Sequence, residues 1–81
     1  MINVERVVSV WNKGDDSFIK DINVDNINLE NLRMIFNPSA DDSDLINVYT
    51  IGQEEAFKLK LLTDIEFDFS QYAYSLECSA K

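Results

Sequence analysis

The sequence predicts an α+β fold, in which a four-stranded antiparallel sheet carries one or two short helices in its connections. Strand-like runs stand near both ends of the chain, and apolar residues at helical spacing lie between them. The length of 81 residues favours one domain, 1–81. We expect one thin core, because a domain this small buries only about 60% of the surface that its unfolded chain exposes.

The first expected element is a β-hairpin. The run NVERVVSVWN is rich in Val and ends in Trp11, and FIKDI, residues 18–22, is a second strand-like run. Between them, KGDDS places Gly14 next to two Asp, which is a turn signal. Alternation puts Val8 and Val10 on one face of the first strand and Glu5 and Trp11 on the other, so that both faces carry apolar residues.

A short helix is expected next. The apolar residues of NVDNINLENLRMIFNPSA fall near helical spacing. Asn28 is suited to be the N-cap, and Ile27 and Leu32 are placed to form a hydrophobic staple. The pair Asn37-Pro38 predicts the end of the helix, because the residue before Pro avoids the α region.

The second half of the chain predicts two further strands and a second helix. DLINVYTI is strand-like, with Ile46 and Val48 on one face and Leu45, Asn47 and Tyr49 on the other. For residues 53–62 the pattern allows a strand or a helix; we favour the helix, since acids open the segment and good helix formers follow.

The end of the chain, IEFDFSQYAYSLECSA, contains the clearest one-sided strand pattern. Tyr72, Tyr74, Leu76 and Cys78 alternate with small or polar residues. Its leading IEFDF is either an extended lead-in or a short strand. The resulting order, β-β-α-β-α-β, suggests an antiparallel sheet.

The charge balance restricts the partners. Fifteen acidic and seven basic residues give a net charge of −8, which disfavours direct binding to nucleic acid or to an anionic membrane. The same charge is compatible with a basic protein partner and fast association. Alternatively, the acidity only keeps the domain soluble.

Cysteine usage and the N-terminal sequence indicate a compartment. A single cysteine excludes an internal disulfide and fits a reducing environment. The N-terminus lacks the pattern of a signal peptide, and no apolar run approaches the roughly 20 residues that cross a bilayer. We therefore expect a cytoplasmic protein.

The residue types argue against catalysis. The chain has no histidine, and no Gly-rich loop is present to cradle a phosphate. Cys78 shares a strand face with apolar residues and is expected in the core. The acids of DDSD, residues 41–44, lack the spacing of a calcium loop, and Glu66 and Asp68 are expected to face solvent as an idle pair. We thus expect no enzyme, no metal and no cofactor, and favour a binding module.

A partner is expected to dock on the outer face of the sheet. Exposed aromatic residues among acids are typical of recognition surfaces. The alternative is that loops cover Trp11 and Tyr49 and that the acids have no partner. The expected outer face carries Glu5, Ser9, Trp11, Asn47, Tyr49, Ser75 and Glu77.

Three segments give the chain a resemblance to a known family. VVSVWNKGDDSF near the start, NLENLRMIFNP in the middle and DIEFDFSQYAYSLE near the end resemble, in order and length, the cloacin immunity family, small inhibitors that protect bacteria from ribosome-cleaving colicins. The layout is also similar to other short bacterial toxin-immunity proteins.

The resemblance implies both a fold and a function. It implies a four-stranded antiparallel sheet with a short helix before the third strand, and an acidic bacterial protein that binds a basic nuclease toxin domain and blocks its access to RNA. We expect the chain itself to be a monomer or a weak homodimer. A small structural or regulatory interaction domain without a toxin partner stays the alternative. The contact residues that the resemblance implies are Asp41, Asp42, Asp44, Asn47, Tyr49 and Glu77.

Overall fold

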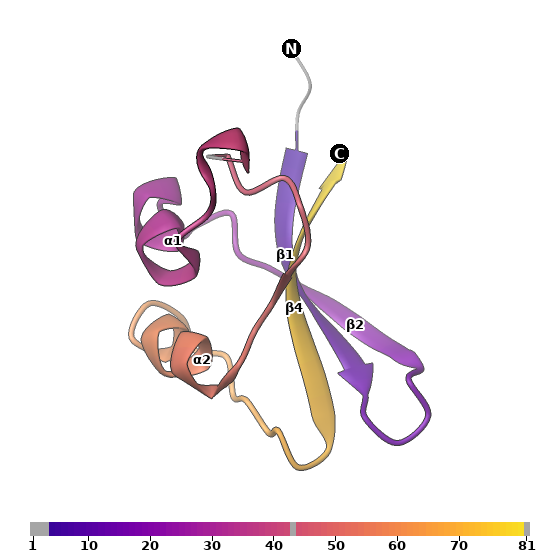
Figure 1. Ribbon diagram of the computed structural model, residues 1–81. Helices are drawn as coiled ribbons and strands as arrows, with labels where there is room; N and C mark the ends of the chain where they lie inside the picture. The colour runs from indigo at the N-terminus through magenta and orange to yellow at the C-terminus, as the bar shows by residue number, and fades with distance from the viewer. Residues whose placement is uncertain (1–3, 43, 81) are drawn as a thin grey trace.

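The computed structural model describes residues 4–42 and 44–80, the last of these by its backbone alone. The elements in chain order are β1 (Val4–Asn12), β2 (Phe18–Asn23), α1 (Leu29–Phe36), the 3₁₀ turn η1 (Ala40–Asp42), β3 (Tyr49–Thr50), α2 (Gln53–Lys60) and β4 (Tyr72–Ala80). The strands pair in the order β2-β1-β4-β3, and every pair is antiparallel. The predicted fold class is confirmed, and both helices lie on the same side of the sheet (Figure 1).

The hairpin of β1 and β2 forms where the sequence predicts it. Val8 lies opposite Ile22, but the register shifts between Val10 and Trp11, so that Trp11 lies opposite Phe18. This bulge adds a residue to β2 and re-aims the side chains at its start.

The two helices begin at residues that the sequence identifies. The Asn28 side chain accepts a hydrogen bond of 2.7 Å from the Glu30 N–H, as expected of an N-cap. Asn37 adopts a left-handed conformation (φ 48°) and ends α1. In α2, the Glu55 carboxylate accepts from the Gly52 N–H at 2.8 Å, which satisfies a free donor of the first turn and confirms the helical alternative for this segment.

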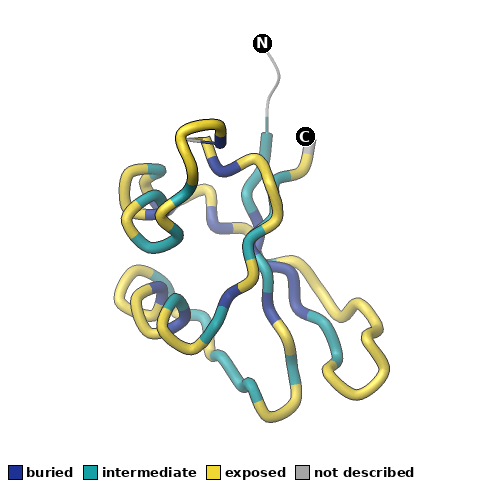
Figure 2. The backbone as a smooth tube through the Cα atoms, in the orientation of Figure 1, coloured by how far each residue is buried: buried dark blue, intermediate teal, exposed yellow. Residues whose placement is uncertain are grey.

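The core lies between the helices and one face of the sheet. Leu32 of α1 and Leu59 of α2 are fully buried and belong to one cluster with β1 and β4 residues. From the strands this cluster takes Val8, Val10, Tyr74 and Leu76, whose side chains share one face through the β1–β4 register. Buried positions accordingly gather along the central strands and on the inner sides of the helices (Figure 2). Among the described residues no helix is long and apolar enough to cross a membrane.

The third strand is much shorter than the sequence predicts. Only Tyr49 and Thr50 pair with β4, and the expected strand residues before them form a loop. Leu45 is fully buried in a left-handed conformation (φ 56°), which is incompatible with an extended strand. The backbone of the following residues bonds to a side chain in place of a neighbouring strand, as described below.

The segment IEFDF forms no strand. Phe67 and Phe69 instead turn back onto Tyr74 of β4, with ring centroids 4.8 and 5.3 Å away. The Tyr74 hydroxyl accepts a hydrogen bond from the Asp68 N–H. Aromatic packing therefore holds this lead-in against the core face of β4.

Candidate protein-interaction surface

None of the described residues forms a helix over the second face of the sheet, and we refer to this face as the open face. Register places side chains from all four strands on it, because residues paired across strands point to the same side. Val7 and Ser9 at its centre are nevertheless buried, since strands flank β1 on both sides. The open face comprises Glu5, Val7, Ser9 and Trp11 of β1, Phe18, Asp21 and Asn23 of β2, Thr50 of β3, and Ala73, Ser75, Glu77 and Ser79 of β4.

The charged side chains of the open face are all acidic. Glu5 of β1, Asp21 of β2 and Glu77 of β4 lie on three neighbouring strands, and none of the described strand residues on this face is a lysine or arginine. Short hydrogen bonds from serines hold two of these carboxylates: Ser9 Oγ donates to Asp21 at 2.6 Å and Ser75 Oγ donates to Glu77 at 2.7 Å. The serines fix the direction of the carboxylates, which favours recognition because less side-chain entropy is lost on binding.

Two aromatic rings lie at one end of the same face. Trp11 and Phe18 meet edge to face, with ring centroids 5.2 Å apart. Trp11 is partly buried, whereas Phe18 is exposed, with 51% of its surface accessible to solvent. A rigid aromatic pair beside acids is a combination that protein interfaces favour, because aromatic residues supply contact area at a small entropic cost.

The acidic loop between α1 and β3 is not the uniformly solvated rim that the sequence suggests. Asp42 is only 7% exposed, and its carboxylate accepts hydrogen bonds from the N–H groups of Ile46 and Asn47 and from the Tyr49 hydroxyl. The prediction that Asp42 contacts a partner is therefore corrected: this side chain organises the loop. Its bonds to the backbone of residues 46 and 47 also explain why no strand forms there.

The environment of the Asp42 carboxylate changes two pKa values. The hydrogen bond from Tyr49 is the largest cause that lowers the pKa of Asp42, and the two backbone N–H groups add to it, while burial opposes the shift. The same hydrogen bond raises the pKa of Tyr49. The hydrogen bond thus stabilises the ionised form of the carboxylate and the neutral form of the phenol. Near neutral pH the pair is therefore a fixed structural contact.

Tyr49 lies on the opposite face from the one predicted. It pairs with Leu76 of β4, so its ring points to the helix-covered side, where it contacts the ring of Phe36 at a centroid distance of 5.9 Å. The sequence reasoning placed Tyr49 outward and Ile46 and Val48 on the opposite, inward face, whereas Ile46 and Val48 are exposed and Leu45 and Tyr49 turn inward.

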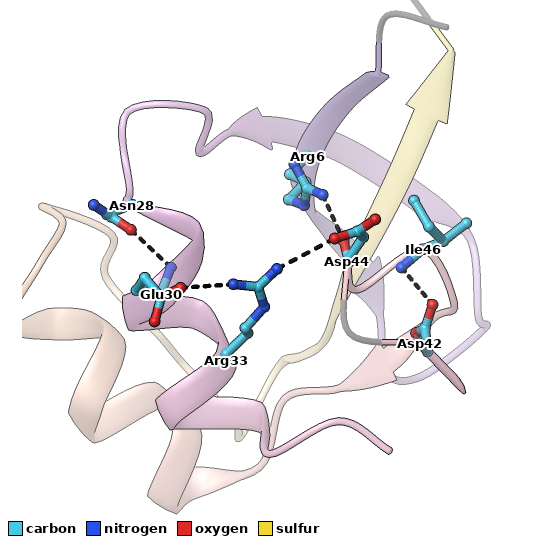
Figure 3. A network of polar contacts seen from close by, with 7 residues as sticks. All are labelled: Arg6, Asn28, Glu30, Arg33, Asp42, Asp44 and Ile46. Carbon is cyan, nitrogen blue, oxygen red and sulfur yellow. Dashed lines mark hydrogen bonds and ion pairs between the residues drawn. The ribbon is translucent and has the colours of Figure 1, made fainter. Parts of the chain in front are cut away.

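The other predicted loop residues are exposed but lie apart from the open face. Arg6, on the helix-covered face of β1, donates to the Asp44 carbonyl and so ties the loop to that side (Figure 3). The Asp44 carboxylate also forms an ion pair of 3.2 Å with Arg33, and Arg33 forms a second ion pair of 2.7 Å with Glu30 (Figure 3). Asp41 and Asn47 are exposed on the same loop. The structure thus brings Glu5, Trp11 and Glu77 together on one face and separates Asp41, Asp44 and Asn47 from them.

Among the open-face residues that the sequence reasoning missed, Asp21 carries a charge and Phe18 an aromatic ring. The bulge opposite Trp11 decides which residues of β2 share its face. The two-residue alternation of FIKDI alone puts Phe18 on the face of Lys20 and Ile22, so the sequence offers no direct signal for the observed pairing.

Comparison with known proteins identifies one family. A family model described as a domain of unknown function matches residues 5–77. No curated protein and no solved structure matches the chain.

Proposed function

The chain belongs to the DUF7683 family, whose model covers most of its length, and we propose that it is an immunity protein that binds and neutralises a basic antibacterial nuclease toxin domain. The observation that carries the proposal is the open face, where three carboxylates and an aromatic pair lie together without a lysine or arginine among the described strand residues. The resemblance of the sequence to cloacin immunity proteins supports the same reading. The proposed site of action is the bacterial cytoplasm, where such a toxin would act.

The mechanism is stoichiometric inhibition through charge. A nuclease binds the phosphates of RNA with a basic surface. Glu5, Asp21 and Glu77 present carboxylates that substitute for those phosphates, and lysines or arginines of the toxin bind them. Trp11 and Phe18 supply apolar contact beside the acids. The net charge of −8 steers the two proteins together before contact.

The loop of Asp41, Asp44 and Asn47 has a secondary part in this proposal. Its acids add to the overall field, but the loop lies on the helix-covered side, where Arg6 holds it. Its substitution should therefore affect binding less than substitution of the open face.

The proposal predicts that a gene next to that of this chain encodes a nuclease toxin domain, and it is tested with that domain. The purified chain should form a one-to-one complex with that domain and abolish its cleavage of RNA. Trp11 is the only tryptophan of the chain. With a toxin variant that lacks tryptophan, a change in tryptophan fluorescence on binding therefore comes from Trp11 on the open face. Absence of a complex, or undiminished RNA cleavage, would refute the proposal in favour of an interaction domain without a toxin partner.

A further inference from the structure

A groove lies on the helix-bearing side of the sheet, between the edge strand β2 and the segment that follows α2. It has a volume of about 870 Å³. Its walls combine β2 side chains with residues 60–66, and its deepest lining includes Val10 and Tyr74 of the core. The two helices pack over β1, β4 and β3, which leaves this flank of the sheet with loop cover only (Figure 1).

The groove gathers exposed apolar side chains. Ile19, Leu61 and Leu62 line it and are 44%, 75% and 40% exposed. Apolar groups of this size at the mouth of a groove indicate a surface that another chain covers.

The charges of the groove are balanced and unpaired. Two lysines, Lys20 and Lys60, and two acids, Asp64 and Glu66, line the groove. Within the described part of the chain their side chains make no hydrogen bond or ion pair, whereas Arg6, Lys13, Arg33 and Lys58 each have a polar partner. With two lysines and two acids in one patch, a two-fold contact in which each lysine of one copy lies beside an acid of the other leaves no like charges facing.

The edge of β2 offers backbone groups to such a copy. Val24 donates its N–H to the Arg6 carbonyl, so the hydrogen-bonded pairs with β1 fall at residues 24, 22 and 20. The N–H and C=O groups of Asp21 and Asn23 therefore point away from β1, toward the free edge. An exposed edge of this kind is a template for pairing with another strand.

Electrostatics selects one register for two antiparallel copies of β2. A two-fold axis through Asp21 or Lys20 would set identical charges directly opposite each other, which is destabilising. An axis through Ile22 sets Ile22 against its own copy on the groove side and pairs Asp21 with the partner's Asn23. This register uses the outward backbone groups and avoids facing charges.

From these observations we infer that the chain forms a two-fold homodimer through its β2 edges, with the groove of each copy closed by the other. The inference is independent of the proposed function. In this dimer the two sheets continue across the β2 edges, so that Asp21 and Asn23 of each open face lie next to the partner's Asn23 and Asp21, while the rest of the open face stays exposed.

A charge-exchange experiment tests the pairing. One variant carries Lys20→Glu and Lys60→Glu, and a second carries Asp64→Lys and Glu66→Lys. At 0.15 M salt, which screens the general repulsion between acidic copies, sedimentation should show the unaltered chain dimerising and each variant weakened by at least tenfold. Mixing the two variants should restore a dimer that contains one of each. A monomeric unaltered chain, or variants that do not restore a dimer on mixing, would overturn the inference.

A cysteine cross-link tests the register independently of the charges. In a Cys78→Ser background, Ile22→Cys places two thiols across the proposed axis, at the short separation of a directly opposite pair. It should give a disulfide-linked dimer under mild oxidation, whereas the control Lys20→Cys should not. Equal cross-linking of both variants, or none with Ile22→Cys, would contradict this register. If groove variants leave the chain monomeric but weaken toxin binding, the groove belongs to the toxin and the inference is wrong.

Discussion

Neutralising the three open-face carboxylates is expected to slow the association with a basic toxin domain. The variant Glu5→Gln, Asp21→Asn, Glu77→Gln changes the net charge from −8 to −5. The amides keep the size of the side chains and can still accept from Ser9 and Ser75. The fold should therefore stay intact while the charge is lost.

The magnitude follows from Coulomb's law. Each carboxylate that approaches a toxin cation to about 7 Å contributes about 0.6 kcal/mol in water at low salt. Three such contacts give about 1.8 kcal/mol, or about 20-fold in the association rate constant. At 0.15 M salt, where the Debye length is about 8 Å, the effect falls to about threefold.

Stopped-flow fluorescence of Trp11 at two salt concentrations measures this effect. The matched control neutralises three exposed acids of the helix-bearing side, Glu30→Gln, Asp41→Asn and Glu54→Gln, and changes the net charge by the same amount. The control should retain most of the association rate. Equal slowing by both variants would show that only the overall charge matters, and would refute the assignment of contact to the open face.

Four further predictions concern the framework. Asp42→Asn should unfold at a lower denaturant concentration than Asp41→Asn in urea titrations, because only Asp42 is buried and triply bonded; equal midpoints would contradict this role. The pKa of Asp42 is lower in the folded chain than its ordinary value of 3.8. The contribution of the Asp42 carboxylate to stability is therefore complete above pH 3.8 and is lost as the pH falls through the folded pKa. An acid-unfolding midpoint that Asp42→Asn leaves unchanged would argue against this contribution. Leu32→Ala should cost about 2–5 kcal/mol of unfolding free energy, against almost none for the exposed Met34→Ala, and similar losses in both would mean that α1 packs by another face. Asn28→Ala should cost about 1 kcal/mol through loss of the N-cap, measured by thermal unfolding, and no change would show that the cap is dispensable.

Local signals in the sequence were enough to predict most of the fold. The N-cap at Asn28, the helix end at Asn37 and the one-sided pattern of β4 each depend on a few neighbouring residues, and all three are present in the structure. The hairpin likewise follows from a turn between two strand-like runs.

The errors arose where a side-chain contact or a bulge overrides the alternation of apolar and polar residues. Residues 45–48 alternate as a strand does, but Asp42 captures their backbone N–H groups, and Leu45 turns into the core. Tyr49 lies on the inward side with Leu45, while Ile46 and Val48 are exposed, so the prediction had exchanged the two sides of this segment. The bulge opposite Trp11 had a similar effect on the candidate site, because it brought Phe18 to the open face. Neither event has a marker in the alternation of apolar and polar residues.

The central claim, that the open face binds a basic nuclease domain, is tested most directly by inhibition of RNA cleavage. Increasing amounts of the chain are added to the toxin domain encoded beside it, and the remaining cleavage is measured. The account predicts complete inhibition at one chain per toxin. At low protein concentration, the variant Glu5→Gln, Asp21→Asn, Glu77→Gln should need more than one chain per toxin to reach the same inhibition. Cleavage that persists at a large excess of the unaltered chain would contradict it.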